Sequence, residues 1–263
     1  MKFLPFGYYI YKIQNFSQKI EHKDTLTLLI SKKLYFLLYG VPDLHSHIRY
    51  RCIKREIKNL KTLDVGGGDG YFTFQSCLNG INNITLSPYT KQEQIQAQII
   101  AESDTRFKGV KIVCDDAQYL DQFPDNSFDQ IMAIDVLEHV IDLDMAVKSV
   151  IKKLKPGGRL IVSVPTHQYP KFFGQKFDDD IGHLRHFSYN SLHITFENYG
   201  LVTENIKPYT FYYTSKLCHF YYDSLSSTMP KIIFLPILNC FSIITERIHT
   251  KIYTELLAVF RKL

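Results

Sequence analysis

The sequence has no long run of basic residues, although its 263 residues carry a formal net charge of +5. Lys and Arg are spread along the whole chain, and no segment is typical of a tract that follows a phosphate backbone. We therefore expect no nucleic-acid partner. Internal repeats and low-complexity segments are also lacking, and the 45% hydrophobic content is enough for a full core.

Cysteine is scarce and lacks the CxxC spacing of metal-binding and redox motifs. The chain contains only Cys52, Cys77, Cys114, Cys218 and Cys240. Scattered single cysteines of this kind are typical of buried thiols in a reducing cytoplasm.

Long hydrophobic runs are absent as well. Segment 1–11, MKFLPFGYYIY, lacks the long apolar core and the small-residue cleavage site of a signal peptide, which predicts that it belongs to the mature protein. Segment 232–244 contains a proline and an asparagine and is shorter than the roughly 20 apolar residues that cross a bilayer. We expect a cytoplasmic protein in which segment 232–244 is suited to a membrane surface rather than to a membrane interior.

Strand-like and helix-like patterns alternate from residue 60 onward. Such alternation is typical of βαβ units and predicts an α/β fold: a doubly wound, mostly parallel, seven-stranded sheet with helices on both faces. The expected strands are 60–65, 81–86, 110–114, 128–134, 159–164, 201–206 and 255–261. The expected helices of this core are 71–78, 90–102, 140–154 and 188–199.

Further segments flank and interrupt this core. Residues 1–58, with helical spacing at 26–38, are expected to form a helical N-terminal extension. Residues 59–208 form the core, in which a loop of about twenty residues follows Pro165, and loops of that length usually carry function. Residues 209–263 supply a helical insertion rich in aromatic side chains, and then the closing strand.

A glycine-rich turn follows the first expected strand, in the sequence Asp64-Val65-Gly66-Gly67-Gly68-Asp69-Gly70. Missing side chains let a backbone approach a ligand closely and adopt positive φ. A dinucleotide fingerprint is disfavoured because Tyr71 stands where its third glycine should be, and a P-loop because no Gly-Lys-Ser/Thr follows. An acid at the strand tip repels phosphates but attracts the ammonium group of a methionine moiety. A purely structural turn is the remaining alternative.

At these residues the chain resembles the class I S-adenosylmethionine-dependent methyltransferases, especially the ubiquinone-type and other small-molecule branch. The similarity runs from Leu60 to Leu201 in consistent order and includes further motifs at 123–129, 135–140, 154–158 and 182–188. The resemblance implies that the methionine end of the cofactor is held by Asp64, Gly66, Gly67, Gly68 and Gly70. It also implies that Asp116 and Ala117 read the adenine edge.

The second strand departs from the pattern of many members, in which a terminal acid binds the ribose hydroxyls. Thr85 stands at that position, and a hydroxyl gives a weaker, uncharged hydrogen bond. A similar strand ending occurs in cyclopropane-fatty-acid, sterol and tocopherol methyltransferases, where a nearby glutamine helps; Gln92 and Gln94 are the candidates here. We include Thr85 and Ser87 among the cofactor-binding residues. The likeness to these enzymes favours a lipid-like acceptor.

The resemblance places Asp135, at the tip of the fourth strand, beside the reacting methyl group and among the cofactor-binding residues. Because a sulfonium methyl is already a strong electrophile, the protein has mainly to align donor and acceptor and sometimes to remove one proton. Histidine is the natural base near neutral pH. His183 and His186 in the long loop are the catalytic candidates, ahead of His139. A structural or surface role is the alternative for each.

The pairs His183-x-x-His186 and His45-x-His47 raise the alternative of a metal site. Neither spacing is compelling, so we expect no bound metal. The Asn/Asp-Pro-Pro-aromatic element of nucleic-acid amino-methylating enzymes is also lacking, because residues 135–137 read Asp-Val-Leu after the fourth strand. DNA adenine methylation is therefore not expected.

Together these patterns predict an enzyme that transfers a methyl group from S-adenosyl-L-methionine to a small-molecule acceptor. The acceptor is expected to be lipid-like or glycosidic and to be methylated at oxygen or carbon. Two alternatives stay open: a non-catalytic cofactor-binding or partner subunit with a methyltransferase fold, and a nicotinamide-dependent oxidoreductase. For the aromatic insertion at 209–250 the interpretations are core packing, a cover over the acceptor pocket, and weak association with a membrane surface.

Overall fold

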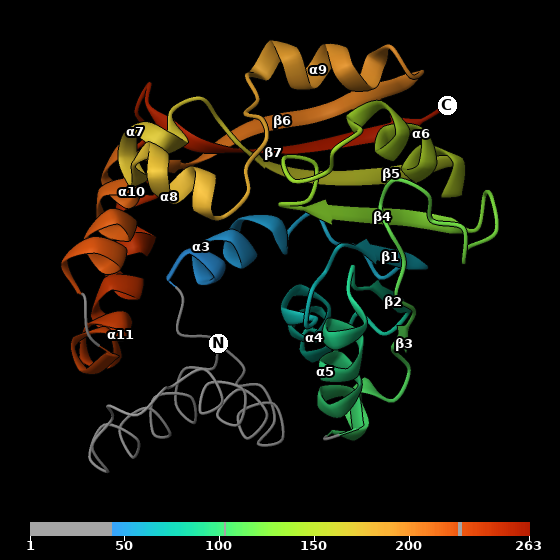
Figure 1. The fold of residues 1–263 in the computed structure, drawn as a ribbon, viewed down its shortest axis with the longest axis horizontal. Coiled ribbons are helices and arrows are strands. Elements are labelled where there is room, and N and C mark those ends of the chain that lie inside the picture. The colour runs from blue at the N-terminus through green and yellow to red at the C-terminus, as the bar shows by residue number, and fades with distance from the viewer. Residues whose placement is uncertain (1–43, 103, 226–227) are drawn as a thin grey trace.

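The computed structural model describes residues 44–102, 104–225 and 228–263. The helical pattern expected at 26–38 lies outside the described residues. Seven strands form one sheet in the order β3-β2-β1-β4-β5-β7-β6, which confirms the expected α/β fold (Figure 1). The strands are β1 Thr62–Val65, β2 Ile84–Ser87, β3 Lys111–Ile112, β4 Phe128–Ile134, β5 Leu154–Pro165, β6 Leu201–Phe211 and β7 Tyr253–Lys262.

The sheet is parallel from β1 to β5, and β7 runs antiparallel between β5 and β6. Strands β1 and β4 are buried along almost their whole lengths, as expected of apolar strands covered on both faces. The chain order reverses at β1, because β2 and β3 lie on one side of it and β4 and β5 on the other. Such a switch point opens a crevice at the carboxyl ends of parallel strands.

Alternate residues of the central strands face two different helical layers. Ile131 of β4 packs in the core cluster that includes side chains of α6 (Leu143–Lys153) and α9 (Tyr189–Glu197). The next residue, Met132, packs in the cluster that includes α3 (Leu44–Ile53). The described helices that accompany α3 in the second layer are α4 Tyr71–Leu78 and α5 Lys91–Glu102.

More helices lie at the end of the sheet toward which the arrow of β4 points (Figure 1). The expected loop after Pro165 is partly helical, since it contains two short helices that Gly174, at a φ of 90°, separates. Helices this short are stabilised by tertiary packing rather than by their own periodicity, so the sequence pattern misses them. The helices at this end are α7 Tyr169–Phe173, α8 Gln175–Asp180, α10 Tyr212–His219 and α11 Thr228–Thr245.

Helices α10 and α11 stand between β6 and β7, which confirms the expected helical insertion before the last strand. A 3-10 turn, η1 Thr105–Phe107, follows α5, and a π-helical turn, η2 Phe220–Ser224, follows α10. No helix among the described residues is both long and apolar enough to cross a bilayer.

Candidate functional site

The glycine turn connects β1 to α4 in a conformation that requires glycine. Gly66, Gly68 and Gly70 have φ values of 62°, 55° and 90°, in the left-handed region that L residues with a side chain avoid. A Cβ atom on Gly66 would lie 2.7 Å from the side chain of Val136, and one on Gly70 would lie 2.5 Å from the ring of Phe74. The turn therefore brings bare backbone close to the tip of β4.

Asp64 lies beneath this turn with its side chain closed off from solvent. One carboxylate oxygen, Oδ2, accepts a 2.6 Å hydrogen bond from Thr73 Oγ1, and the other has no partner among the described residues. Burial raises the pKa of Asp64 to about 7, against the smaller lowering effect of the hydrogen bond from Thr73. A Cβ atom on Gly67 would come within 2.7 Å of Oδ2, so the acid and the turn are packed directly together.

A cavity of about 360 Å³ opens at the carboxyl ends of the strands, beside the glycine turn. It brings together four of the residues predicted to bind a cofactor: Gly66, Asp116, Ala117 and Asp135. The other lining residues are Tyr89, Glu93, Asp115, Gln118, Val136, His139, Val140 and Ile141. The remaining predicted residues, which do not line it, are Asp64, Gly67, Gly68, Gly70, Thr85, Ser87, His183 and His186.

The wall of the cavity at Asp116 and Ala117 is held by local hydrogen bonds. Asp116 Oδ1 accepts from the backbone N–H of Gln118 at 2.8 Å, and Asp115 Oδ1 accepts from the N–H of Asp116 at 2.9 Å. A bond from an aspartate to the backbone N–H two residues on, like that of Asp116, is typical of an Asx-turn, which fixes the local course of the chain. Ala117 is buried and presents an apolar surface to the cavity.

Near the end of β2, the residues that line the cavity are not the ones predicted from the sequence. Thr85 is half-buried in the middle of the strand, and the hydroxyl of Ser87 is buried without a hydrogen-bond partner among the described residues. The cavity is lined instead by Glu93, in the first turn of α5. Gln94 turns away and donates to the carbonyl of Ile112 at 3.2 Å.

Glu93 is a functional candidate that the sequence reasoning missed. Its carboxylate accepts from the backbone N–H of Thr90 at 2.9 Å, and its own N–H donates to Thr90 Oγ1 at 3.1 Å. This reciprocal pair is a capping box, whose Thr-x-x-Glu pattern is visible in the sequence. Because the box directs the acid back toward the end of β2, the pattern contained the signal for an acid at this edge of the cavity.

Asp135 lies at the tip of β4 in an unusual backbone conformation, with a φ of 54°. Non-glycine residues in this region store strain and cluster at functional sites. Its carboxylate is 2.7 Å from Arg49 Nε and accepts from Ser163 Oγ at 3.1 Å. Burial raises the pKa of Asp135, against the lowering effect of Arg49. Arg49 Nη2 also lies 2.6 Å from Glu255, so one guanidinium bridges two carboxylates from opposite parts of the chain.

A cluster of histidines and acids lies next to Asp135. His183 Nδ1 is 2.7 Å from Asp178 Oδ1, and His186 Nε2 is 3.0 Å from Asp178 Oδ2. The ring of His139 lies 5.0 Å from that of His183, centroid to centroid, so the two catalytic candidates and His139 form one group. Burial lowers the pKa of His183 to about 4, although Asp178 acts in the opposite direction.

Glu138 completes this cluster. Its side chain is fully buried, and neither carboxylate oxygen has a hydrogen-bond partner in another of the described residues. Burial raises the pKa of Glu138 well above its usual range, and the nearby carboxyl of Asp135 acts in the same direction.

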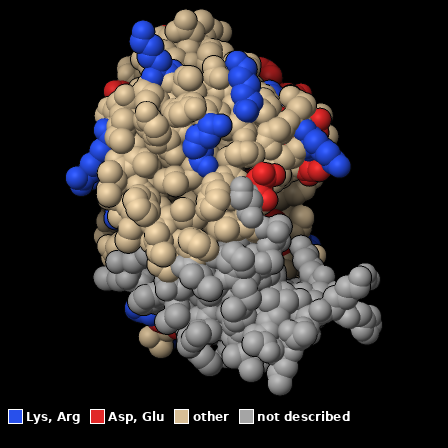
Figure 2. Space-filling view, turned by 90° about the vertical axis from the view of Figure 1, so that its left-hand side faces the viewer, with Lys and Arg blue, Asp and Glu red and all other residues tan. Residues whose placement is uncertain are grey.

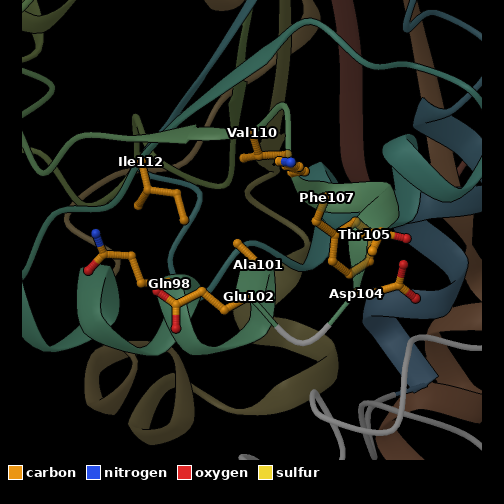
Figure 3. A pocket seen from close by; sticks show the side chains of 9 residues that line it. Gln98, Ala101, Glu102, Asp104, Thr105, Phe107, Val110 and Ile112 are labelled. Atoms are coloured by element: carbon orange, nitrogen blue, oxygen red, sulfur yellow. The ribbon is translucent and has the colours of Figure 1, made fainter.

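A second cavity of similar size, about 350 Å³, lies between α5, η1 and β3 (Figure 3). Gln98 and Glu102 reach its rim from α5, and Phe107 lines it from η1. It shares no lining residue with the cavity beside the glycine turn and contains none of the predicted site residues. We therefore take the cavity beside the glycine turn as the candidate site.

Comparison with known proteins gives a consistent result. The model of a family described as a methyltransferase domain matches residues 40–206, more than half of the chain. The ubiquinone/menaquinone biosynthesis C-methyltransferase UbiE of Saccharophagus degradans is 34% identical over 105 residues, 39% of this chain and 41% of the relative. The ubiquinone biosynthesis O-methyltransferase of Rickettsia prowazekii is 28% identical over 132 residues, 48% of this chain and 50% of the relative. The chain thus spans about half the length of the curated relatives it matches.

Solved structures show the same fold. An S-adenosylmethionine-dependent methyltransferase from Mesorhizobium loti superposes with a TM-score of 0.57 at 16% sequence identity. The match covers 83% of this chain and 100% of that chain. At this identity the likeness shows the fold alone.

Proposed function

The chain belongs to the methyltransferase-domain family, and from this premise we propose that it transfers a methyl group from S-adenosyl-L-methionine to a small-molecule acceptor. The observation that carries the proposal is the cavity of about 360 Å³ that Gly66, Ala117 and Asp135 share at the carboxyl ends of the strands. Ligands of open α/β sheets bind at this edge, where the strand order reverses.

The residues of the cavity fit the parts of this cofactor. The bare backbone of the glycine turn accepts the methionine tail at close range, and the unpaired Asp64 oxygen beneath it adds negative charge when it is ionised. Ala117 and Ile141 offer apolar contacts to the adenine ring. Glu93 supplies a carboxylate that accepts hydrogen bonds from the ribose hydroxyls, a role that Thr85, which does not line the cavity, does not fill. When bound, the cofactor provides an electrophilic methyl group.

We propose that the acceptor binds near Asp135 and the neighbouring histidine cluster. His183 and His186 both bond to the buried Asp178, which fixes the orientation of their rings. A fixed imidazole beside the reacting atoms orients the acceptor and excludes water, which is most of what methyl transfer requires of a protein. We keep His183 and His186 as the residues that contact the acceptor.

A lipid-like acceptor is the form of the proposal that we favour. The two curated relatives act, by their names, in ubiquinone or menaquinone biosynthesis. Helix α11 exposes Phe234, Ile237, Phe241 and Ile244, which follow each other at helical spacing on one face. We propose that this face lies on a membrane surface and brings the cavity near an acceptor dissolved there.

Calorimetric titration with S-adenosylhomocysteine tests the cofactor site. We expect binding to the full chain, and at least tenfold weaker binding to Asp116→Ala, because the turn at Ala117 loses its hydrogen bonds. Asp104→Ala, in the second cavity of similar size, is the matched control and should bind like the unmodified chain. Absence of binding to the unmodified chain would refute the proposal. Binding without turnover of any lipid extract would favour the non-catalytic subunit instead.

A further inference from the structure

Three metal-ligating side chains converge beside the cavity. One ligand atom each of Glu138, His139 and His183 lies within 4.8 Å of the others. Glu138 and His139 follow the tip of β4, and His183 follows α8. A backbone hydrogen bond of 2.8 Å from the N–H of Leu184 to the carbonyl of Glu138 holds the two segments together. The convergence is therefore built into the fold.

The buried carboxyl group of Glu138 has no polar partner in another of the described residues. The side chain has 0% exposure, and neither of its oxygens has a hydrogen-bond partner in another of the described residues. Burying a polar group without a partner is costly, and native structures rarely keep such groups without a reason. The two neighbouring imidazoles make a shared cation the partner that best satisfies this carboxylate.

Both histidines make their hydrogen bonds through Nδ1, which leaves Nε2 available to a metal ion. His139 Nδ1 lies 3.0 Å from the carbonyl of Gly182, which only accepts hydrogen bonds, so the proton is on Nδ1. His183 Nδ1 lies 2.7 Å from the carboxylate of Asp178 and donates to it in the same way. In each ring, Nε2 keeps its lone pair. Metal-binding histidines typically have this arrangement, with the second nitrogen donating to a carbonyl or a carboxylate.

We propose that Glu138, His139 and His183 bind a divalent transition-metal ion. Two imidazoles and one carboxylate are a ligand set that zinc and iron accept, with coordination positions left open for other oxygens. Asp178 supports the site by holding His183. The second set of close groups, Asp178, His183 and His186, is already satisfied by hydrogen bonds of 2.7 and 3.1 Å and needs no ion.

The position of the ion suggests its use, and this part of the inference rests on the proposed function. Because His139 also lines the cavity, an ion bound to it would lie at the edge of the cavity, within reach of a bound acceptor. A metal ion lowers the pKa of a hydroxyl that binds to it. The acceptor hydroxyl then loses its proton to water, its oxygen forms a bond to the methyl carbon, and the carbon–sulfur bond breaks to leave a neutral thioether. The acceptor class is therefore a hydroxyl compound, methylated at oxygen.

Titration of the metal-stripped full chain, without a histidine tag, tests the site directly. We expect one Zn²⁺ per chain by calorimetry, and visible absorption bands of a nitrogen- and oxygen-bound ion with Co²⁺. Glu138→Gln, which keeps the shape of the side chain, and His183→Gln should each weaken Zn²⁺ binding at least tenfold. Asp178→Asn should weaken it as well, in the 10- to 100-fold range typical of residues that orient a ligand.

His193→Gln is the matched control, because His193 pairs with Glu197 on the surface of α9 and lies outside the cluster. It should bind Zn²⁺ like the unmodified chain. Equal loss in His193→Gln, or unchanged binding in both Glu138→Gln and His183→Gln, would overturn the proposal, as would no binding by the unmodified chain. S-adenosylhomocysteine is titrated into the same samples. If the unmodified chain binds S-adenosylhomocysteine but not Zn²⁺, the metal site alone is rejected. If the unmodified chain does not bind S-adenosylhomocysteine, the proposed function is rejected.

Discussion

Asp64 occupies the end of β1 with its carboxyl group closed off from water, and this makes its ionisation costly to the fold. The pKa of the group in the unfolded chain is near 3.8, and burial raises it to about 7 in the native state. As the pH rises, the unfolded chain loses this proton first. The contribution of Asp64 to stability is therefore greatest below the unfolded pKa and is lost between there and pH 7.

We expect Asp64→Asn to gain stability relative to the unmodified chain as the pH rises from 5 to 8. Each pH unit between the unfolded and the native pKa changes the free energy of unfolding by about 1.4 kcal/mol, which gives a relative gain of about 2.5 kcal/mol that levels off above pH 7. Urea unfolding of both proteins at several pH values measures it. The exposed Asp121→Asn is the control. A stability difference that is constant across this range would contradict the native pKa of Asp64.

At the scale of elements, the turn from β1 to α4 is held by a glycine that no other residue can replace without strain. Gly70 and Gly80 flank α4 with nearly equal φ values of 90° and 93°. They differ in their surroundings: a Cβ atom on Gly70 would meet the ring of Phe74 at 2.5 Å, whereas one on Gly80 would meet nothing within 4 Å. Alanine substitutions at these two positions therefore distinguish the cost of the backbone conformation, which both carry, from the cost of a steric clash, which only Gly70 carries.

Gly70→Ala should lower the free energy of unfolding by about 2–4 kcal/mol, because it combines a left-handed alanine with overpacking. Gly80→Ala should lower it by only about 1–2 kcal/mol, because it carries the backbone cost alone. Denaturant unfolding of the two variants side by side makes the comparison. Equal losses would mean that the ring of Phe74 moves aside freely and that the turn is less tightly packed than its geometry indicates.

The elements that could be predicted from the sequence are those with strong local patterns. Helix α4 and strand β4 have the predicted bounds, since each is an apolar segment that ends at a clear turn signal. Helices α7 and α8 were missed because five or six residues are too few for a period to be visible. Glu93 was missed because a Thr-x-x-Glu capping box marks the start of a helix in many proteins and does not by itself indicate a ligand beside it.

At the scale of the whole molecule, the side chains around Asp135 come from parts of the chain that no local pattern connects. Arg49 and Glu255 are separated by 206 positions in the sequence and lie 2.6 Å apart. The convergence of Glu138 and His139 with His183 likewise depends on how the segment after α8 folds back onto the tip of β4. Residues that stand directly after strands can therefore be predicted from the sequence to lie near one cavity. The side chains that distant segments bring together beside that cavity cannot.

Arg49 links α3 to the tip of β4 and to β7, and its loss should affect the stability of the whole domain. Arg49→Met leaves the half-buried Asp135 and the buried Glu255 without their shared cation, which should cost about 3–5 kcal/mol. Arg106→Met breaks the exposed pair with Asp104 and should cost less than about 1 kcal/mol. Thermal unfolding of both variants checks the contrast. Similar small losses would mean that Arg49 contributes little to holding the three elements together.

The side of the molecule that carries α10 and α11 bears few charged side chains among its described residues: basic ones are scattered over it, and acidic ones lie toward the right in Figure 2. An apolar helix face with sparse basic residues around it is suited to an anionic membrane surface. Phe241 and Ile244 are 54% and 60% exposed on α11, so their apolar surface is available to lipid. We expect the full chain to float with anionic vesicles at low salt and to be released as the salt concentration rises.

Replacing both Phe241 and Ile244 by Ser should lower the vesicle partition coefficient at least tenfold, because burial of each side chain is worth roughly 1.5–3 kcal/mol. Ile194→Ser on α9 is the matched control, since Ile194 is 54% exposed on a different side of the sheet. It should float like the unmodified chain. Flotation that the double substitution leaves unchanged would remove α11 from the membrane contact, and with it the physical reason to place the acceptor in a lipid layer.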